Sequence, residues 1–225
     1  MEQISESREK SLTTPRAAAI AGILFSVLLL ISIVLIRISI PEEIRDSSSW
    51  ISDNLKNVGL ALNLVPFAGI AFLWFIGVVR DRLGVNEDRF FATVFLGSGL
   101  LFLAMLFTSA ATAGGLITIY LADTGTQIDS SVYYYGRHIT NQIMTVYTIK
   151  MAGVFMISTC TLTMRTRILP HWMAYLGLAL ALVLLLSFGF TFWAILIFPL
   201  WVLLISVHIL FENLGQKTSS QTVGS

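Results

Sequence analysis

A single lysine is the residue whose position most needs a chemical explanation. Lys150 lies within the apolar stretch NQIMTVYTIKMAGVFMISTC, and the nearest acidic residue, Asp129, is more than twenty positions away. A primary amine in such a place can bind an anion, take part in proton transfer, or form a Schiff base with a carbonyl compound. Placing a charged lysine at the centre of a bilayer costs at least about 2.5–3.5 kcal/mol. Lys150 therefore needs either a partner or a neutral amine.

Three further polar residues are candidates to line a cavity or contact a ligand together with Lys150: Tyr147, Asn63 and Asp123. Tyr147 lies almost one helical turn before Lys150, Asn63 lies three positions before Pro66, and Asp123 follows the third apolar run. All 13 acidic residues fall in tails, loops or the ends of apolar runs, so none is expected at the depth of Lys150. Three explanations stay open: a neutral amine, a hydrated cavity open to the outer side, and an anionic ligand or second subunit that supplies the counterion.

The patterns of common catalytic and metal sites are absent from the sequence. There is no phosphate-binding glycine loop, no dinucleotide-binding glycine pattern, no H-E-x-x-H zinc motif and no G-x-S-x-G nucleophile elbow. The three histidines, His138, His171 and His208, lie on different segments, and we expect His138 on the opposite side of the membrane from the other two. The single cysteine, Cys160, excludes an intramolecular disulfide. We therefore expect no enzyme, no bound metal and no cofactor.

The composition places these residues in a membrane protein. Of the 225 residues, 56% are hydrophobic and 12% are charged, whereas soluble domains carry roughly 25% charged residues. The lipid bilayer is therefore the first partner that the sequence predicts. The net charge of +1 gives no reason to expect nucleic-acid binding, because the few basic residues lie at the ends of apolar runs.

Six apolar runs reach the length of a membrane-spanning helix, about 20 residues. They cover approximately Ala17–Ile36, Val58–Val79, Phe90–Ile119, Ile139–Met164, His171–Ser187 and Thr191–Phe211. The fifth run is short, and only the stretch SFGFT separates it from the sixth. The sequence therefore predicts an all-α fold, a polytopic transmembrane bundle of six spans. Five spans with a longer, irregular last one is the alternative.

The distribution of lysine and arginine predicts the direction of threading. With the N-terminus inside, nine basic residues fall in inner segments and four in outer ones. Because inner loops of membrane proteins carry the excess of basic residues, both termini should face the cytoplasm. The predicted organisation is a cytoplasmic tail over residues 1–16, a six-helix domain over 17–211, and a disordered cytoplasmic tail over 212–225.

Two more predictions concern how the spans pack. Polar residues occupy two faces of the fourth span, with Tyr147 and Ser158 on one and Thr148 and Thr159 on the other. This pattern favours a central place in the bundle, with protein on both sides. The outer loop from Leu121 to Arg137 is rich in tyrosine, so we expect it to fold over the outer mouth of the bundle rather than to be a flexible linker.

Three segments resemble stretches of uncharacterised bacterial multi-pass inner-membrane proteins of the domain-of-unknown-function type. They are FLWFIGVVRDRLG, EDRFFATVFLGSGLLF and RTRILPHWMAYLGLALALVLL, and the resemblance covers about half of the chain. It implies an address in the bacterial plasma membrane and carries no activity.

Two functional hypotheses follow from these observations. The first is a non-enzymatic accessory or interaction protein, whose partner is a second copy of the chain or another membrane protein. The second is a small transporter or channel, in which a central cavity at Lys150 receives a small anionic ligand. A water-accessible cavity at Lys150 would favour transport, whereas a lysine packed against backbone carbonyls would favour the interaction protein.

Overall fold

The protein is a bundle of long helices. The computed structural model describes residues 2–39, 48–83, 89–122, 130–166, 170–187 and 193–222, and these residues contain no strand. The elements are α1 (Glu2–Ser39), α2 (Ser48–Leu83), α3 (Arg89–Ala122), α4 (Ser130–Gln142), the π-helix η1 (Ile143–Thr148), α5 (Ile149–Thr166), α6 (His171–Leu186) and α7 (Ala194–Thr222). The all-α transmembrane bundle predicted from the sequence is confirmed.

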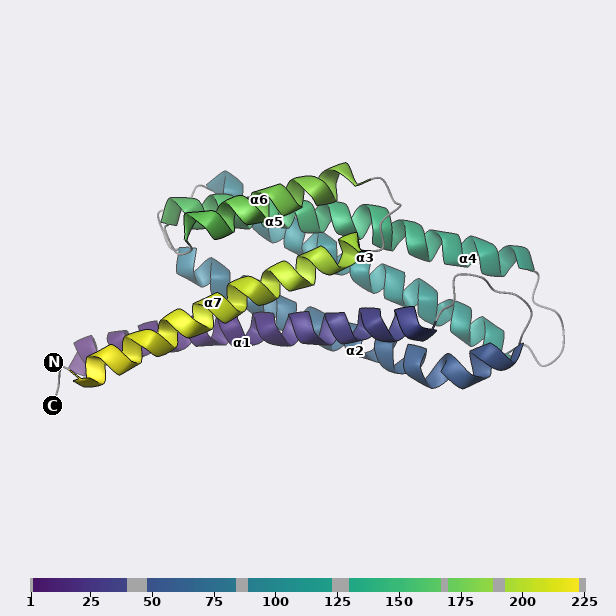
Figure 1. Ribbon diagram of the computed structural model, residues 1–225, viewed down its shortest axis with the longest axis horizontal. Coiled ribbons are helices and arrows are strands. Elements are labelled where there is room, and N and C mark those ends of the chain that lie inside the picture. Colours follow the sequence, from purple (N-terminus) through teal and green to yellow (C-terminus); the bar gives the residue numbers. More distant parts are fainter. Residues whose placement is uncertain are drawn as a thin grey trace.

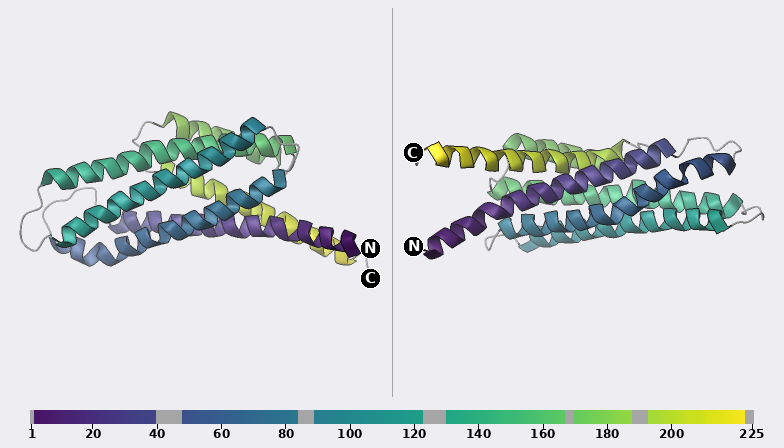
Figure 2. Two further views of the ribbon diagram at one scale, coloured as in Figure 1. Left: turned by 180° about the vertical axis from the view of Figure 1, so that it is seen from behind. Right: turned by 90° about the horizontal axis from the view of Figure 1, so that it is seen from below.

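The chain passes along the bundle six times. Five stretches are long and apolar enough to cross a membrane, namely Arg16–Ile36, Lys56–Arg80, Phe90–Thr118, Tyr134–Arg165 and Ala194–Glu212, and α6 is a shorter apolar helix between the last two. Figures 1 and 2 show the two chain ends at the same end of the bundle, as an even number of passes requires. The chain is therefore a multi-pass membrane protein in contact with lipid. Which end faces the cytoplasm stays a prediction.

The fourth pass has protein on more than one side. α5 packs against α3, α6 and α7, while α1 packs against α2 and α7. In an apolar 18-residue stretch of the span Tyr134–Arg165, 56% is buried, against 33–44% for the corresponding stretches of the other four long spans. This agrees with the central place that its two polar faces predict.

Phenylalanine side chains fill the middle of the bundle. The ring of Phe72 on α2 lies 4.5 Å from Phe25 of α1, 5.2 Å from Phe102 of α3 and 5.1 Å from Phe155 of α5, measured between ring centroids. Phe198 of α7 lies 5.7 Å from Phe72. Because these tilted and edge-on pairs join five helices, they fix how the helices stand relative to one another.

Residues 143–148 depart from the regular helix that the sequence predicts for the fourth span. This stretch is the π-helix η1, and α4 and α5 continue it on either side. A π-turn shifts the backbone ladder and leaves carbonyl groups without their usual partners. Threonine hydroxyls supply donors there: Thr148 donates to the Ile143 carbonyl at 2.9 Å, and Thr145 to the Asn141 carbonyl at 2.7 Å.

The outer loop differs in part from the expected cover over the bundle. Its residues from Ser130 onward form α4, which continues the line of α5 in Figure 1 and packs along α3. The hydroxyl of Thr140 donates to that of Thr112 at 2.9 Å, and Ser109 donates to the Thr140 carbonyl at 3.2 Å. This part of the loop therefore prolongs the helix bundle instead of folding across its mouth. Residues 123–129 lie outside the described part of the chain.

Both segments expected as cytoplasmic tails contain helix. α1 begins at Glu2, and α7 continues to Thr222, through most of the segment for which the sequence predicts disorder. The assignment of the two tails to the cytoplasm stays a prediction.

Candidate functional site

Lys150 binds the end of a neighbouring helix. It is the second residue of α5, and its ammonium group donates hydrogen bonds to backbone carbonyls of α6. The partners are the carbonyl of Leu185, the carbonyl of Ser187 at 2.8 Å, and more distantly the carbonyl of Leu184 at 3.4 Å. The side chain is half-buried. The lysine therefore closes the carboxyl end of α6.

The end of α6 is built to receive this group. Ser187 leaves the helix with an extended backbone (φ −65°, ψ 122°), and its N–H donates to the Val183 carbonyl at 2.9 Å. Its hydroxyl donates to the Leu184 carbonyl at 2.8 Å. The last carbonyls of any helix lack partners within the helix, and lipid offers none. Lys150 supplies the donors that the last turn of α6 still needs.

The electrostatics of this arrangement favour a cation. The carboxyl end of a helix carries a partial negative charge, so a nearby ammonium group gains about 0.3–1 kcal/mol, and up to about 2 kcal/mol where the geometry is partly buried. Hydrogen bonds that involve a charged group contribute about 1.5–3 kcal/mol. Together these terms are similar in size to the insertion cost of the lysine.

Backbone carbonyls were one of the partners that the sequence left open for Lys150, but the helix that supplies them was not predicted. The short length of the predicted fifth span could have indicated that the end of this helix lies near Lys150. From His171 to Leu186, α6 has 16 residues. Lys150 lies 15 positions before Arg165, near the end of α5 that precedes α6 in the sequence, so the lysine and the last turn of α6 should meet at one level.

Tyr147 and Asn63, two of the other candidate residues, have exposed side chains. Tyr147 lies in η1 with 54% of its surface exposed. Asn63 is exposed on α2, where its amide donates to the Gly59 carbonyl at 2.9 Å rather than to the carbonyl that Pro66 frees. Asp123 lies outside the described residues. A ligand contact by any of these three residues stays a prediction.

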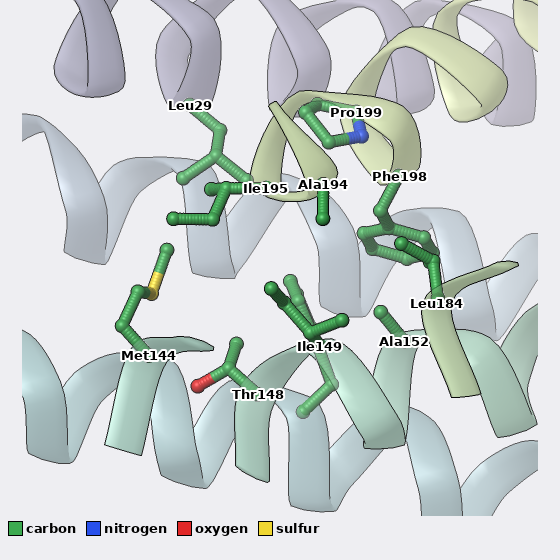
Figure 3. Close-up of a pocket in the computed structure, with 11 residues that line it drawn as sticks. Leu29, Met144, Thr148, Ile149, Ala152, Leu184, Ala194, Ile195, Phe198 and Pro199 are labelled. Carbon is green, nitrogen blue, oxygen red and sulfur yellow. The ribbon is translucent and has the colours of Figure 1, made fainter. Parts of the chain in front are cut away.

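A small apolar cavity is lined by residues that include Ile149 and Leu184, and Figure 3 shows this lining. Met144, Thr148 and Ile149 face Leu29 and Ile195 across it. Phe102, Ala152, Leu184, Ala194, Phe198 and Pro199 complete the lining. Its volume of about 10 Å³ is close to the minimum for one water molecule, which would also need polar partners.

The lining offers almost no polar group to a solute. The hydroxyl of Thr148 already donates to the Ile143 carbonyl. Lys150, Tyr147 and Asn63 do not line this cavity. The cavity therefore gives no support to a polar binding chamber at Lys150.

The described histidines do not belong to a group of side chains that could hold a metal ion. Within the described ranges no group of three or more His, Cys, Asp or Glu side chains could hold a metal ion. His138 is exposed on α4, His171 opens α6, and His208 on α7 lies 3.5 Å from the carboxylate of Glu212.

No protein-family model matches the chain, and no curated protein or solved structure matches it.

Proposed function

We propose that the protein is a non-enzymatic accessory or interaction protein of the bacterial inner membrane. The observation that carries this proposal is the way Lys150 is used: its ammonium group holds the end of α6. The one feature that suggested a transport site thus has a structural use. The contact of Lys150 with α6 and the phenylalanine core both hold the helices of the bundle together. The exposed surfaces of the bundle are then the places where a partner protein would bind.

The first test separates this proposal from transport. The purified protein is reconstituted into liposomes that carry potassium, chloride or proton gradients, and ion flux is followed with a potential-sensitive dye. Flux equal to that of protein-free liposomes is expected. A flux that the Lys150→Met variant abolishes would establish the transport alternative and overturn the proposal.

The second test asks for a protein partner directly. A photo-crosslinking amino acid is placed in living cells at exposed positions on two helices, Trp74 on α2 or Trp172 on α6, and at buried Phe155 as the matched control. Discrete adducts with a second copy or another membrane protein are expected from an exposed position and none from Phe155. Exposed positions that yield only lipid adducts would contradict the proposal.

A further inference from the structure

The helix α6 is shorter than the hydrocarbon core of an ordinary bilayer is thick. α6 has 16 residues, about 24 Å at 1.5 Å per residue, whereas the hydrocarbon core of a bilayer is about 30 Å thick. Its outer end is set by Ser187, which leaves the helix, and by Lys150, which binds the last carbonyls. The contact with Lys150 therefore fixes the position of the C-terminal end of α6 along the bundle axis relative to α5.

The neighbouring helix gives the same height independently. Arg165 to Lys150 is 15 residues on α5, which corresponds to about 22 Å. α5 and α6 are held in register by close packing, since a Cβ atom at Gly153 would lie only 3.2 Å from the Ala181 carbonyl oxygen. Two helices thus place the cluster about 22–24 Å from the inner boundary.

The helix α3, which packs on another side of α5, has a longer apolar span than α6. On α3 the apolar span Phe90–Thr118 has 29 residues, about 43 Å. Figure 1 shows α3 and α4 continuing well beyond the level at which α6 ends and α7 begins. Tilting the whole bundle cannot make α6 span the full hydrocarbon core. A tilted helix covers a smaller distance along the membrane normal, so tilt would make α6 still shorter in that direction.

The surface of α6 is one that lipid chains cover. After His171, which opens the helix, its exposed residues are apolar or aromatic: Trp172, Tyr175, Leu176, Ala179, Leu182, Val183 and Leu186. Trp172 marks the inner end, and Trp193, 71% exposed just before α7, marks the outer end. Tryptophan favours the boundary between the hydrocarbon and the headgroups. Trp172 and Trp193 therefore mark the two boundaries of the hydrocarbon layer that contacts α6 and α7.

We propose that the α6–α7 face binds a phospholipid bilayer whose outer leaflet is thinned locally, by about 6–8 Å, so that headgroups descend to the level of Lys150 and Ser187. The thinning exposes the ends of α6 and α7 to polar surroundings instead of hydrocarbon. It applies to this face and not to the α3 face, and it does not depend on the proposed function.

The test compares two matched positions. Leu186 and Ala104 are both exposed, and each lies 15 residues from the inner end of its helix, His171 for α6 and Arg89 for α3. Single cysteines at these sites, in a Cys160→Ala background, carry nitroxide labels in dioleoyl phosphatidylcholine vesicles. Their depth is measured by power saturation with oxygen and a water-soluble nickel chelate.

The label at Leu186 should lie shallower than the label at Ala104 by about 6–8 Å. Equal depths would overturn the proposal. The unmodified protein gives a second measurement: its thermal stability should be highest in short-chain dimyristoleoyl lipid and fall toward long-chain dierucoyl lipid. A maximum in the dierucoyl lipid would also overturn it.

Discussion

At the scale of single residues, Lys150 illustrates how backbone carbonyls at the end of a helix can receive the charged group of a lysine. Its partners include the carbonyls of Leu185 and Ser187, at the end of α6, where backbone carbonyls have no partner within the helix. The positive group and the negative helix end satisfy each other. A lysine at this depth is therefore compatible with a packed, non-transporting bundle.

Replacing the lysine should weaken the folded state. In Lys150→Met the carbonyls of α6 lose their donor, and we expect a loss of about 1–3 kcal/mol in the free energy of unfolding. Removing the charge does not offset this loss. The cost of placing the lysine in the membrane is paid in the folded state and also in the unfolded state, where the helix is inserted but not packed, so this cost cancels in the free energy of unfolding. Unfolding in mild detergent measures the change, and hydrogen exchange should quicken in the last turn of α6.

The exposed Tyr147 provides the control for this prediction, since Tyr147→Phe should leave both the stability and the exchange unchanged within about 0.5 kcal/mol. If Lys150→Met keeps full stability and slow exchange at the end of α6, the lysine is not a helix cap.

The sequence could reveal the lysine but not what it binds. Its distance in sequence from every acidic residue follows from the spacing of charged residues. Its partner is a backbone carbonyl, which every residue carries and no sequence letter marks. Tyr147 and Asn63 have exposed side chains, and helical spacing alone does not say which helix, if any, faces them, so a ligand contact by either residue stays a prediction.

At the scale of elements, the pairing of α5 and α6 depends on small residues at the contact. Gly177 of α6 faces the thiol of Cys160 on α5 and the indole of Trp201 on α7. The sequence shows where glycines occur but not which of them touch a neighbour. It also could not show η1, because a π-turn leaves the apolar pattern of the span almost unchanged.

Adding one methyl group at this contact should separate the helices. A Cβ atom at Gly177 would lie 2.5 Å from the Cys160 sulfur and 2.6 Å from the Trp201 nitrogen, and the rigid indole cannot move aside without shifting α7. We expect Gly177→Ala to lower the free energy of unfolding by about 1–3 kcal/mol.

The matched control is Gly97 on α3, where a Cβ atom would meet nothing within 4 Å. Gly97→Ala should be neutral or stabilise the protein by up to about 1 kcal/mol, through helix propensity alone. Melting temperatures in one detergent compare the two variants. A Gly177→Ala protein as stable as Gly97→Ala would show that α5 and α6 are not closely packed.

At the scale of the whole molecule, the number of spans could be predicted because bilayer thickness fixes the length of an apolar helix. The alternative of five spans does not agree with chain ends that lie at one end of the bundle (Figure 2). The unequal heights of α6 and α3 were harder to anticipate. Hydropathy gives the length of each span separately, whereas the common level of the helix ends comes from contacts such as that of Lys150 with Ser187.

The direction of threading is the last prediction. Nine basic residues lie in segments at the end that holds both termini, against four at the other end, so that end should remain in the cytoplasm. Reporter fusions after Ser48, Gly84, Thr126, Thr166 and the C-terminus should read outside, inside, outside, inside and inside. Paired reporters, one active only outside and one fluorescent only inside, control each position. An outside reading at the C-terminus would reject six spans, and a complete reversal of all five readings would keep the fold but invert its orientation.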